Sequence, residues 1–348
     1  MRQFDYSKFE SMTWDGEVLS LVAKIHEFKG RQEMYLLQKP AALERLVEIA
    51  KVQSTEASNK IEGIVTTSAR IKQLCYEKTT PKNRDEEEII GYRDVLNTIH
   101  ESYEYIPLTP NYILQLHEML YHYSGRAIGG RFKNVQNYIS ETRADGTSIV
   151  RFTPLQPYET PDAIKVICES YNKTIDDGVI DPLLLIPVFI NDFLCIHPFN
   201  DGNGRMSRLL TTLLLYRSGY VVGRYVSLEA KIERNKDAYY DVLQTASTHW
   251  HEGNNNFVPF IKYLLGTILS AYRDFEDRIQ LVAEKLPAVE LVRRATQNKV
   301  GKFTKSEIME LCPSIKKASV ENSLNKLVQN GEISRHGSGK NTFYTRNS

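Results

Sequence analysis

The sequence contains little that would direct it to a membrane or to an oxidising compartment. It has only four cysteines, which are widely separated and form no C-x-x-C pair. Such spacing predicts reduced thiols in a cytoplasmic protein. The first residues are polar and acidic and lack the segments of a signal peptide, and no apolar stretch is long enough to span a bilayer. We therefore expect a soluble, cytoplasmic protein. The cysteines are Cys75, Cys168, Cys195 and Cys312.

Net charge is also almost absent, since the formal value at pH 7 is +1. This value argues against general attraction to nucleic acid or to a membrane surface. The charge is uneven, however. From Pro287 onward there are eleven Lys or Arg and five Asp or Glu, whereas the preceding 286 residues carry a net charge of −5. We expect the C-terminal segment to be the part that meets an acidic partner.

Apolar residues recur at a spacing near 3.6 through most of the chain, which predicts a mainly helical protein. Pro182 opens a segment that is apolar on nearly every side as far as Ile196, and a second apolar stretch ends at Gly219. Helices that are apolar all round belong in the middle of a bundle. The loop that begins at His197 therefore lies between two buried helices, which would hold it rigidly.

This loop combines residue types that handle phosphate. Glycines at the start of a helix let backbone N–H groups approach an anion. Asp201 is placed to bind Mg²⁺ together with phosphate oxygens, and Arg205 and Arg208 lie on one helical face where both could grip an oligophosphate. His197, which titrates near neutral pH, is the natural base for an attacking hydroxyl, and Phe199 is expected to anchor the loop in the core. The run reads His197, Pro198, Phe199, Asn200, Asp201, Gly202, Asn203, Gly204, Arg205, Met206, Ser207 and Arg208.

Each of these features alone is more often structural, but together they match H-x-F-x-[DE]-G-N-G-R-x-x-R completely. The chain thus resembles the Fic family. The resemblance implies a helical catalytic core, here residues 109–270, that transfers AMP from ATP to a Ser, Thr or Tyr hydroxyl of a target protein. It implies that His197 is the general base and Asp201 the Mg²⁺ ligand. The ATP-binding set would be Glu62, Pro198, Phe199, Asn200, Asp201, Gly202, Asn203, Gly204, Arg205, Arg208, Tyr239 and Tyr240.

Two further segments match features of that family. Apolar residues between Arg131 and Pro157 surround an Ala-Asp-Gly-Thr turn at 144–147 and predict a β-hairpin, which resembles the flap that aligns a target segment. Its 137–140 stretch would also line the nucleotide pocket. Tyr239 and Tyr240 resemble the tyrosines that face the adenine. Adjacent helical residues point about 100° apart, so we expect one of them to touch the base.

Upstream, residues 58–63 fit the pattern [ST]-x-x-x-E-[GN], which resembles the inhibitory helix of Fic proteins. A carboxylate at Glu62 that reaches Arg208 would occupy the guanidinium that otherwise takes the γ-phosphate. The resemblance therefore implies an autoinhibited enzyme. In some relatives the same glutamate aligns a water that removes AMP, so reverse activity stays open.

The C-terminal segment predicts three helices, to about Asn298, over 304–311 and over 315–329, followed by a hairpin that turns at 337–339. This order describes a winged helix-turn-helix. Lys316 and Lys317 would open the recognition helix, and Arg335, His336 and Lys340 would decorate the wing; DNA and a protein remain equally open as partners. The expected division is an N-terminal helical region at 1–108, the Fic core at 109–270, a helical linker at 271–286 and the winged helix at 287–348.

Two classes of function compete for the whole chain. One is a protein adenylyltransferase with Mg²⁺ and ATP, and the other is a DNA-binding regulator that uses the core as a nucleotide sensor. The base at His197 favours the enzyme, since a sensor has no need of it. A Fic enzyme with a different donor, such as one that transfers UMP, phosphocholine or phosphate, is a third interpretation. The target protein stays undetermined, and monomer and homodimer both remain open.

Overall fold

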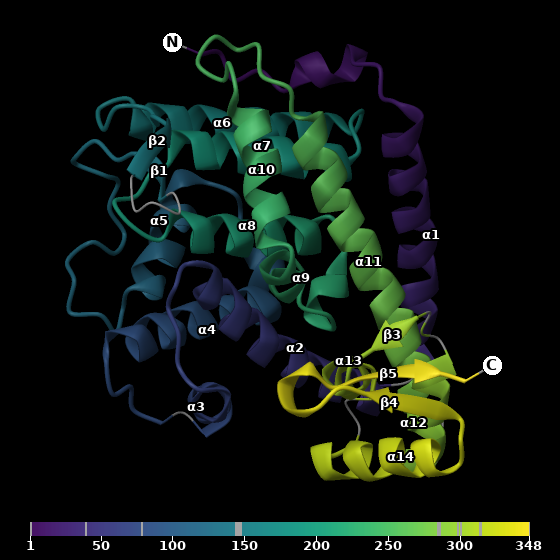
Figure 1. Cartoon of the computed structure of the whole chain (residues 1–348). Helices are drawn as coiled ribbons and strands as arrows, with labels where there is room; N and C mark the ends of the chain where they lie inside the picture. The colour runs from purple at the N-terminus through teal and green to yellow at the C-terminus, as the bar shows by residue number, and fades with distance from the viewer. Residues whose placement is uncertain are drawn as a thin grey trace.

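The computed structural model describes residues 2–38, 40–77, 79–142, 148–283, 287–297, 299, 301–312 and 315–347. The fold is mainly helical, as the sequence predicts (Figure 1). The helices are α1 (Gly16–Gln38), α2 (Pro40–Ile61), α3 (Ser68–Lys72), α4 (Arg84–Ser102), α5 (Pro110–Leu120), α6 (Thr160–Asp177), α7 (Pro182–Ile196), α8 (Asn203–Arg217), α9 (Leu228–Arg234), α10 (Lys236–Ser247), α11 (Val258–Ala283), α12 (Ala288–Gln297), α13 (Lys305–Leu311) and α14 (Lys317–Gln329). The strands are β1 (Ile139–Thr142), β2 (Ser148–Phe152), β3 (Lys302–Phe303), β4 (Ile333–His336) and β5 (Phe343–Arg346).

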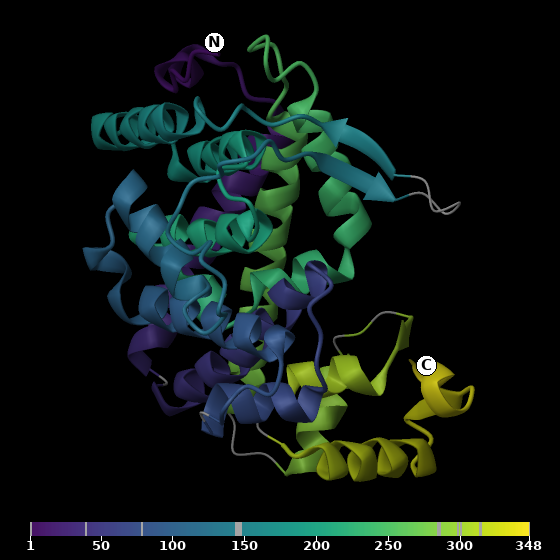
Figure 2. The ribbon, with the colours of Figure 1, turned by 90° about the vertical axis from the view of Figure 1, so that its left-hand side faces the viewer.

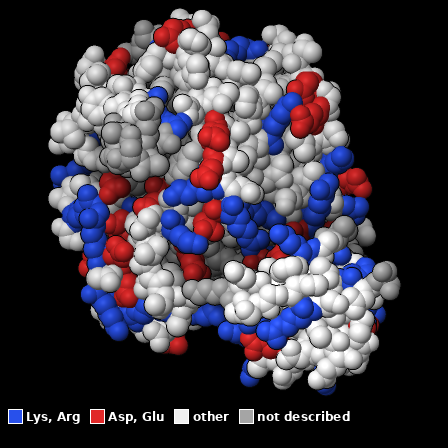
Figure 3. Space-filling view, viewed as in Figure 1, with Lys and Arg blue, Asp and Glu red and all other residues white. Residues whose placement is uncertain are grey.

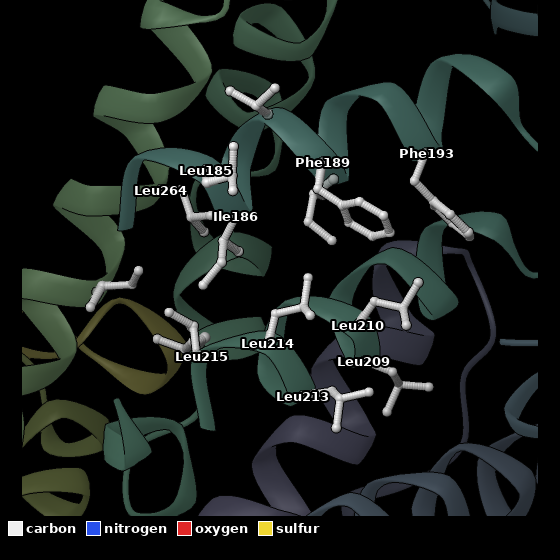
Figure 4. Close-up of a cluster of buried hydrophobic side chains, with 14 of the residues drawn as sticks. Leu185, Ile186, Phe189, Phe193, Leu209, Leu210, Leu213, Leu214, Leu215 and Leu264 are labelled. Carbon is white, nitrogen blue, oxygen red and sulfur yellow. The ribbon is translucent and has the colours of Figure 1, made fainter. Parts of the chain in front are cut away.

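Helices α7 and α8 lie in the middle of the bundle and pack against each other. Asp181 caps α7 by accepting a hydrogen bond from the backbone N–H of Leu183, and Pro182 occupies the first turn, where no N–H is needed. Both helices are buried on nearly every face, which explains their continuous apolar sequence. Figure 4 shows their side chains interdigitating, with Leu264 of α11 beside them.

The N-terminal helices share this core. The long helices α1 and α11 run side by side along one edge of the molecule (Figure 1), and α2 packs against α4 and α9. One hydrophobic cluster extends from Phe4 to Ile279. The segment that carries Glu62 is therefore fixed to the same body as the loop at His197.

The expected hairpin is present as β1 and β2, which pair in antiparallel register from Thr142 opposite Ser148 to Ile139 opposite Phe152. The strands are shorter than the predicted segment, because residues before Ile139 form an irregular loop that lies against the His197 loop. The predicted turn at 144–147 lies outside the described residues. In Figure 2 the hairpin projects from the helical body.

The C-terminal segment forms a second hydrophobic cluster of its own, from Leu291 to Tyr344. The three expected helices are present as α12, α13 and α14, and the expected hairpin as β4 and β5. Thr304 and Glu307 form a capping box at the start of α13. A strand that we did not predict, β3, pairs with β5, so the sheet order is β3-β5-β4.

The remaining expectations concern the cysteines and the membrane. All four cysteines are unpaired, and each except the partly buried Cys75 is buried. Burial raises the pKa of the Cys75 thiol to about 11 and that of Cys168 to about 12, so these thiols are protonated at neutral pH. No helix in the described part of the chain is long and apolar enough to cross a bilayer.

Candidate active site

His197 ends α7 in a left-handed backbone conformation, with φ 53°. This conformation is uncommon for a residue other than glycine and costs about 1–3 kcal/mol, so the surrounding structure must hold it. The backbone N–H of His197 donates to the carbonyl of Phe193 at 2.9 Å. Its ring Nδ1 lies 3.1 Å from the carbonyl oxygen of Leu194. A carbonyl can only accept, so Nδ1 carries the proton and Nε2 keeps the lone pair of the neutral ring.

Burial lowers the pKa of His197 from its ordinary value to about 4, despite the opposing hydrogen bond to Leu194. The expectation of titration near neutrality was therefore wrong, because the sequence did not show how completely the ring is enclosed. The lowered pKa keeps the imidazole neutral at pH 7. Neutral imidazole is the form that accepts a proton.

The loop after His197 is closed by two internal contacts. The amide of Asn203 accepts from the backbone N–H of Phe199 at 2.9 Å and donates to the carbonyl of Phe199 at 2.7 Å. The Phe199 ring is buried and stacks on His117, with centroids 3.7 Å apart and planes 2° apart. Phe199 thus anchors the loop as predicted. The Asn203 side chain is occupied inside the loop, so only its backbone remains for an anion.

Gly202 makes the turn into α8. Its φ is +85°, and an added Cβ would lie 2.9 Å from the Tyr121 hydroxyl, so both backbone and space require glycine. The first N–H groups of α8 have no acceptor within the helix, and no side chain in the described part of the chain caps them. This end of α8 is therefore suited to bind an anion.

Asp201 lies beside this helix start with its side chain 37% exposed. Its Oδ2 accepts a hydrogen bond from Arg126 at 2.7 Å, and its Oδ1 accepts one from the Gly202 N–H at 2.7 Å. Burial acts to raise the pKa of Asp201, but Arg126 and Arg205 lower it by more, so it lies below its usual range. The carboxylate is ionised at neutral pH.

Arg205 is the next charged residue of the motif. Its guanidinium is buried and lies 2.7 Å from Glu88 and 2.7 Å from the hydroxyl of Tyr121. The guanidinium pairs with the buried carboxylate of Glu88 and does not line the cavity, whereas Arg208 does. That Arg205 and Arg208 together hold a phosphate chain stays a prediction.

Arg208 is held by the segment that carries Glu62. Its Nη2 lies 2.7 Å from Glu62 Oε1 and 2.9 Å from the Ser58 carbonyl, and its Nε donates to Ser58 Oγ at 2.8 Å. Burial acts to lower the pKa of Arg208, but Glu62 raises it above its ordinary value. The contact between Glu62 and Arg208 that the sequence predicted is therefore present.

Lys133, which the sequence did not single out, and Asn137, from the predicted 137–140 stretch, hold the loop through its backbone carbonyls. Lys133 Nζ donates to the carbonyl of Ile196 at 2.9 Å, and its backbone N–H donates to that of Pro198 at 2.8 Å. The Asn137 amide donates to the carbonyls of His197, at 3.2 Å, and Phe199, at 2.9 Å. Burial lowers the pKa of Lys133 to about 8. These contacts are made to backbone atoms, so no sequence pattern predicts them.

The loop, Glu62, the hairpin and α10 enclose a cavity of about 790 Å³. Tyr239 and Tyr240 both line it; Tyr239 is 4% exposed and Tyr240 is 43% exposed. From the predicted 137–140 stretch, Ile139 and Ser140 line it. The lining also includes these predicted site residues: Glu62, His197, Asn200, Asp201, Gly202, Asn203, Gly204 and Arg208. Pro198, Phe199 and Arg205 do not line it.

Known proteins are similar to this chain in sequence. The protein adenylyltransferase fic-1 of Caenorhabditis elegans is 24% identical over 252 residues, which are 70% of this chain and 44% of that protein. The protein adenylyltransferase Fic of Drosophila yakuba is 26% identical over 271 residues, which are 76% of this chain and 47% of that protein. The matched stretch thus spans about half the length of these relatives.

Solved structures share the fold. A Fic family protein from Desulfovibrio desulfuricans superposes with a TM-score of 0.63 at 21% identity, over 97% of both chains. A Fic domain containing signaling protein from Bacteroides thetaiotaomicron superposes with a TM-score of 0.61 at 24% identity, over 76% of this chain and 97% of that one. The family model of the Fic/DOC family matches residues 107–215, which include the whole loop. This part of the chain is similar to the Fic/DOC family.

Proposed function

We propose that the protein transfers AMP from ATP to a Ser, Thr or Tyr hydroxyl of a target protein, and of itself, and that Glu62 restrains this activity. One observation carries the proposal. His197, whose Nε2 is unprotonated, lines the same cavity as the uncapped start of α8. A proton acceptor and an anion site are thus brought together. The names of the adenylyltransferase relatives support AMP as the transferred group.

In the proposed reaction, His197 Nε2 takes the proton of the target hydroxyl while the oxygen forms a bond to the α-phosphorus. The bond between that phosphorus and the bridging oxygen breaks, and pyrophosphate leaves with the electron pair. Positioning and charge neutralisation supply most of the catalysis in such transfers. The N–H groups at the start of α8 would stabilise the charge that develops on the phosphate oxygens.

Asp201 is suited to hold Mg²⁺ together with phosphate oxygens. Mg²⁺ prefers hard oxygen ligands and commonly takes one or two carboxylates plus phosphate. The ionised, part-exposed carboxylate of Asp201 meets this requirement, and within the described ranges no group of three or more His, Cys, Asp or Glu could form an all-protein metal site. The ion would neutralise phosphate charge when bound.

The hairpin would position the target segment. A two-stranded hairpin has free edges whose N–H and C=O groups can pair with an extended peptide. Ile139, Ser140 and Phe152 of this hairpin line the cavity, so a paired segment would pass the opening near His197.

Glu62 would act as a brake because it already occupies Arg208. A γ-phosphate would have to replace a carboxylate at 2.7 Å from Nη2 and would meet its negative charge. ATP would then bind in a pose that does not favour transfer. Reverse removal of AMP with the help of Glu62 is a further activity of the same site that this arrangement allows.

We propose that the C-terminal cluster is a winged helix domain at 287–348 that binds a partner. The rest of the chain would divide into the helical region at 1–108, the core at 109–270 and the linker at 271–286. Lys316 and Lys317 at the start of α14 and Arg335 on β4 supply the positive charge for DNA or for an acidic protein. Figure 3 shows Lys and Arg on this part of the surface. We infer a cytoplasmic location from the four unpaired thiols.

The decisive experiment incubates wild type and Glu62→Gly with Mg²⁺ and with α-labelled or γ-labelled ATP, with and without a cell lysate. We expect protein labelling from the α position only, stronger in Glu62→Gly and absent in Glu62→Gly/His197→Ala. Label from the γ position only would identify a kinase and overturn the donor assignment. Equal labelling of wild type and Glu62→Gly would remove the brake.

A further inference from the structure

The wall of the cavity formed by α7 contains a buried amide that the proposed reaction does not use. Asn191 is 1% exposed, and its Nδ2 has no hydrogen-bond partner among the described residues. Among the residues that the structure describes, its Oδ1 meets only the Cys195 thiol, at 3.9 Å, which is a weak contact. A buried polar group without a partner costs about 1–3 kcal/mol, so it calls for an explanation.

Asn191 belongs to the helix face that borders the cavity. Leu194 and Cys195 follow it by three and four residues, and all three line the cavity together with His197. Asn191 precedes His197 by six residues, about 9 Å along the helix. The amide is therefore at a distance from the anion-binding loop, and the base of a nucleotide whose phosphates lie at that loop could reach it.

Part of the lining suits a flat ring. Leu243 and Tyr240 of α10 and Phe152 of β2 line the cavity, beside polar side chains such as Gln244 and Ser247 of α10. Aromatic and aliphatic walls with a small number of polar groups are the usual composition of a site for a small ligand. A base in this position would bury its faces against apolar atoms and present an edge to Asn191.

We propose that Asn191 reads the base of the nucleotide: its Oδ1 accepts from the 6-amino group of adenine, and its Nδ2 donates to an adjacent ring nitrogen, N1 or N7. The inference rests on the proposed function. An amide presents a donor and an acceptor side by side, which matches the paired donor and acceptor on an adenine edge. Binding would then satisfy the unpartnered Nδ2. A site built in this way discriminates strongly against analogues that lack the bonded group.

The test measures nucleotide dissociation constants in a Glu62→Gly/His197→Ala background, in which the brake and turnover are both removed. The probes are ATP, the triphosphate of purine riboside, which lacks the 6-amino group, and 1-deaza-ATP and 7-deaza-ATP, which lack one ring nitrogen each. Without Asn191 substitution, we expect the purine riboside probe and one deaza probe to bind about tenfold more weakly than ATP. With Asn191→Leu, all four should bind with similar constants.

Two further variants make the result specific. Asn191→Asp keeps the size and an acceptor but loses the donor, so it should still discriminate against the purine riboside probe and no longer against the deaza probe. Cys195→Ala alters the same wall and removes the weak thiol contact of Oδ1 but keeps the amide, so it should keep the ratios of the background protein. It is the matched control for a general disturbance of the pocket.

Two results would overturn the inference alone: equal binding of all four probes before Asn191 is changed, or unchanged ratios in folded Asn191→Leu and Asn191→Asp. Melting temperatures of both variants confirm that they are folded. If the background protein binds none of the four nucleotides, the proposed function fails as well. AMP transfer by Glu62→Gly, measured separately, distinguishes these cases.

Discussion

Glu62 Oε1 lies 2.7 Å from Arg208 Nη2, and Gly204 is the residue that lets it approach so closely. A Cβ at Gly204 would lie 2.2 Å from Glu62 Oε1 and 3.3 Å from Arg208 Nη1. The second glycine of the motif therefore serves two states: it leaves backbone N–H groups open to an anion, and it leaves room for the carboxylate that excludes that anion. The proposed brake and the proposed phosphate site share one space.

Ser58→Ala should weaken the brake. The change removes the Oγ that accepts from Arg208 Nε at 2.8 Å, and a hydrogen bond to a charged group contributes about 1.5–3 kcal/mol. We expect AMP transfer to increase by about tenfold, less than in Glu62→Gly. Ser54→Ala is the matched control, because Ser54 is equally buried on α2 but donates to Glu229. Equal stimulation by both variants would mean that loosening of α2, rather than the Arg208 contact, sets the rate.

Gly204→Ala should destabilise the protein only when Glu62 is present. The new methyl group displaces the Glu62 carboxylate and separates it from Arg208. In Glu62→Gly the clash is absent, so the same change should leave the melting temperature unchanged or raise it slightly. Thermal unfolding of the four proteins of this cycle should give a coupling energy of about 1–3 kcal/mol. Additive effects would show that the two residues do not share the space.

Much of this architecture follows from local sequence. The apolar runs on both sides of His197 predict α7 and α8 because a helix that is apolar all round must be buried. The glycines predict the turn into α8. These features depend on neighbours in the chain, so the sequence contains enough to find them. The contact of Glu62 with Arg208 was implied by the resemblance of residues 58–63 to a family motif and not by local sequence.

Other features depend on partners that are distant in the chain. Arg205 does not line the cavity, and its guanidinium pairs with Glu88, on α4. Lys133 and Asn137 hold the loop through backbone carbonyls, which every residue has and no pattern distinguishes. The pKa of His197 depends on how many atoms surround the ring, which only the packed structure determines.

Arg205→Met should reduce stability, whereas Arg208→Met should reduce nucleotide affinity. Arg205 is paired with a carboxylate that is 2% exposed, and removing one partner of a buried pair costs about 3–5 kcal/mol. The partner of Arg208, Glu62, is 31% exposed and can regain water. The melting temperature should therefore fall more in Arg205→Met, and the dissociation constant for ATP should rise more in Arg208→Met. A larger loss of ATP affinity in Arg205→Met than in Arg208→Met would show that Arg205 does bind phosphate.

Stability should fall as the pH decreases from about 6.5 to 4. Burial lowers the pKa of His100 to about 3 and that of His117 to about 4, as it does for His197. The folded protein keeps these rings neutral, while the unfolded chain binds protons below about pH 6.5. Each histidine then lowers the free energy of unfolding by up to about 1.4 kcal/mol for each unit by which the pH falls. Denaturant unfolding at several pH values should show that the free energy of unfolding falls less steeply with decreasing pH in His100→Asn than in wild type. An identical fall in both proteins would contradict the role of His100.

The chemical step should not show the pH dependence of an ordinary histidine. A base whose pKa is about 4 is deprotonated throughout the range from pH 5.5 to 8, so a histidine titration near 6.5 should be missing from the rate profile. Single-turnover AMP transfer by Glu62→Gly, with saturating ATP, should be flat over this range and fall below about pH 5. His249→Asn, which alters a histidine outside the lining of the cavity, should reproduce this profile. An inflection near pH 6.5 in both proteins would mean that bound nucleotide returns the pKa of His197 toward its ordinary value. Burial in the free protein would then not determine the protonation state of the base during transfer.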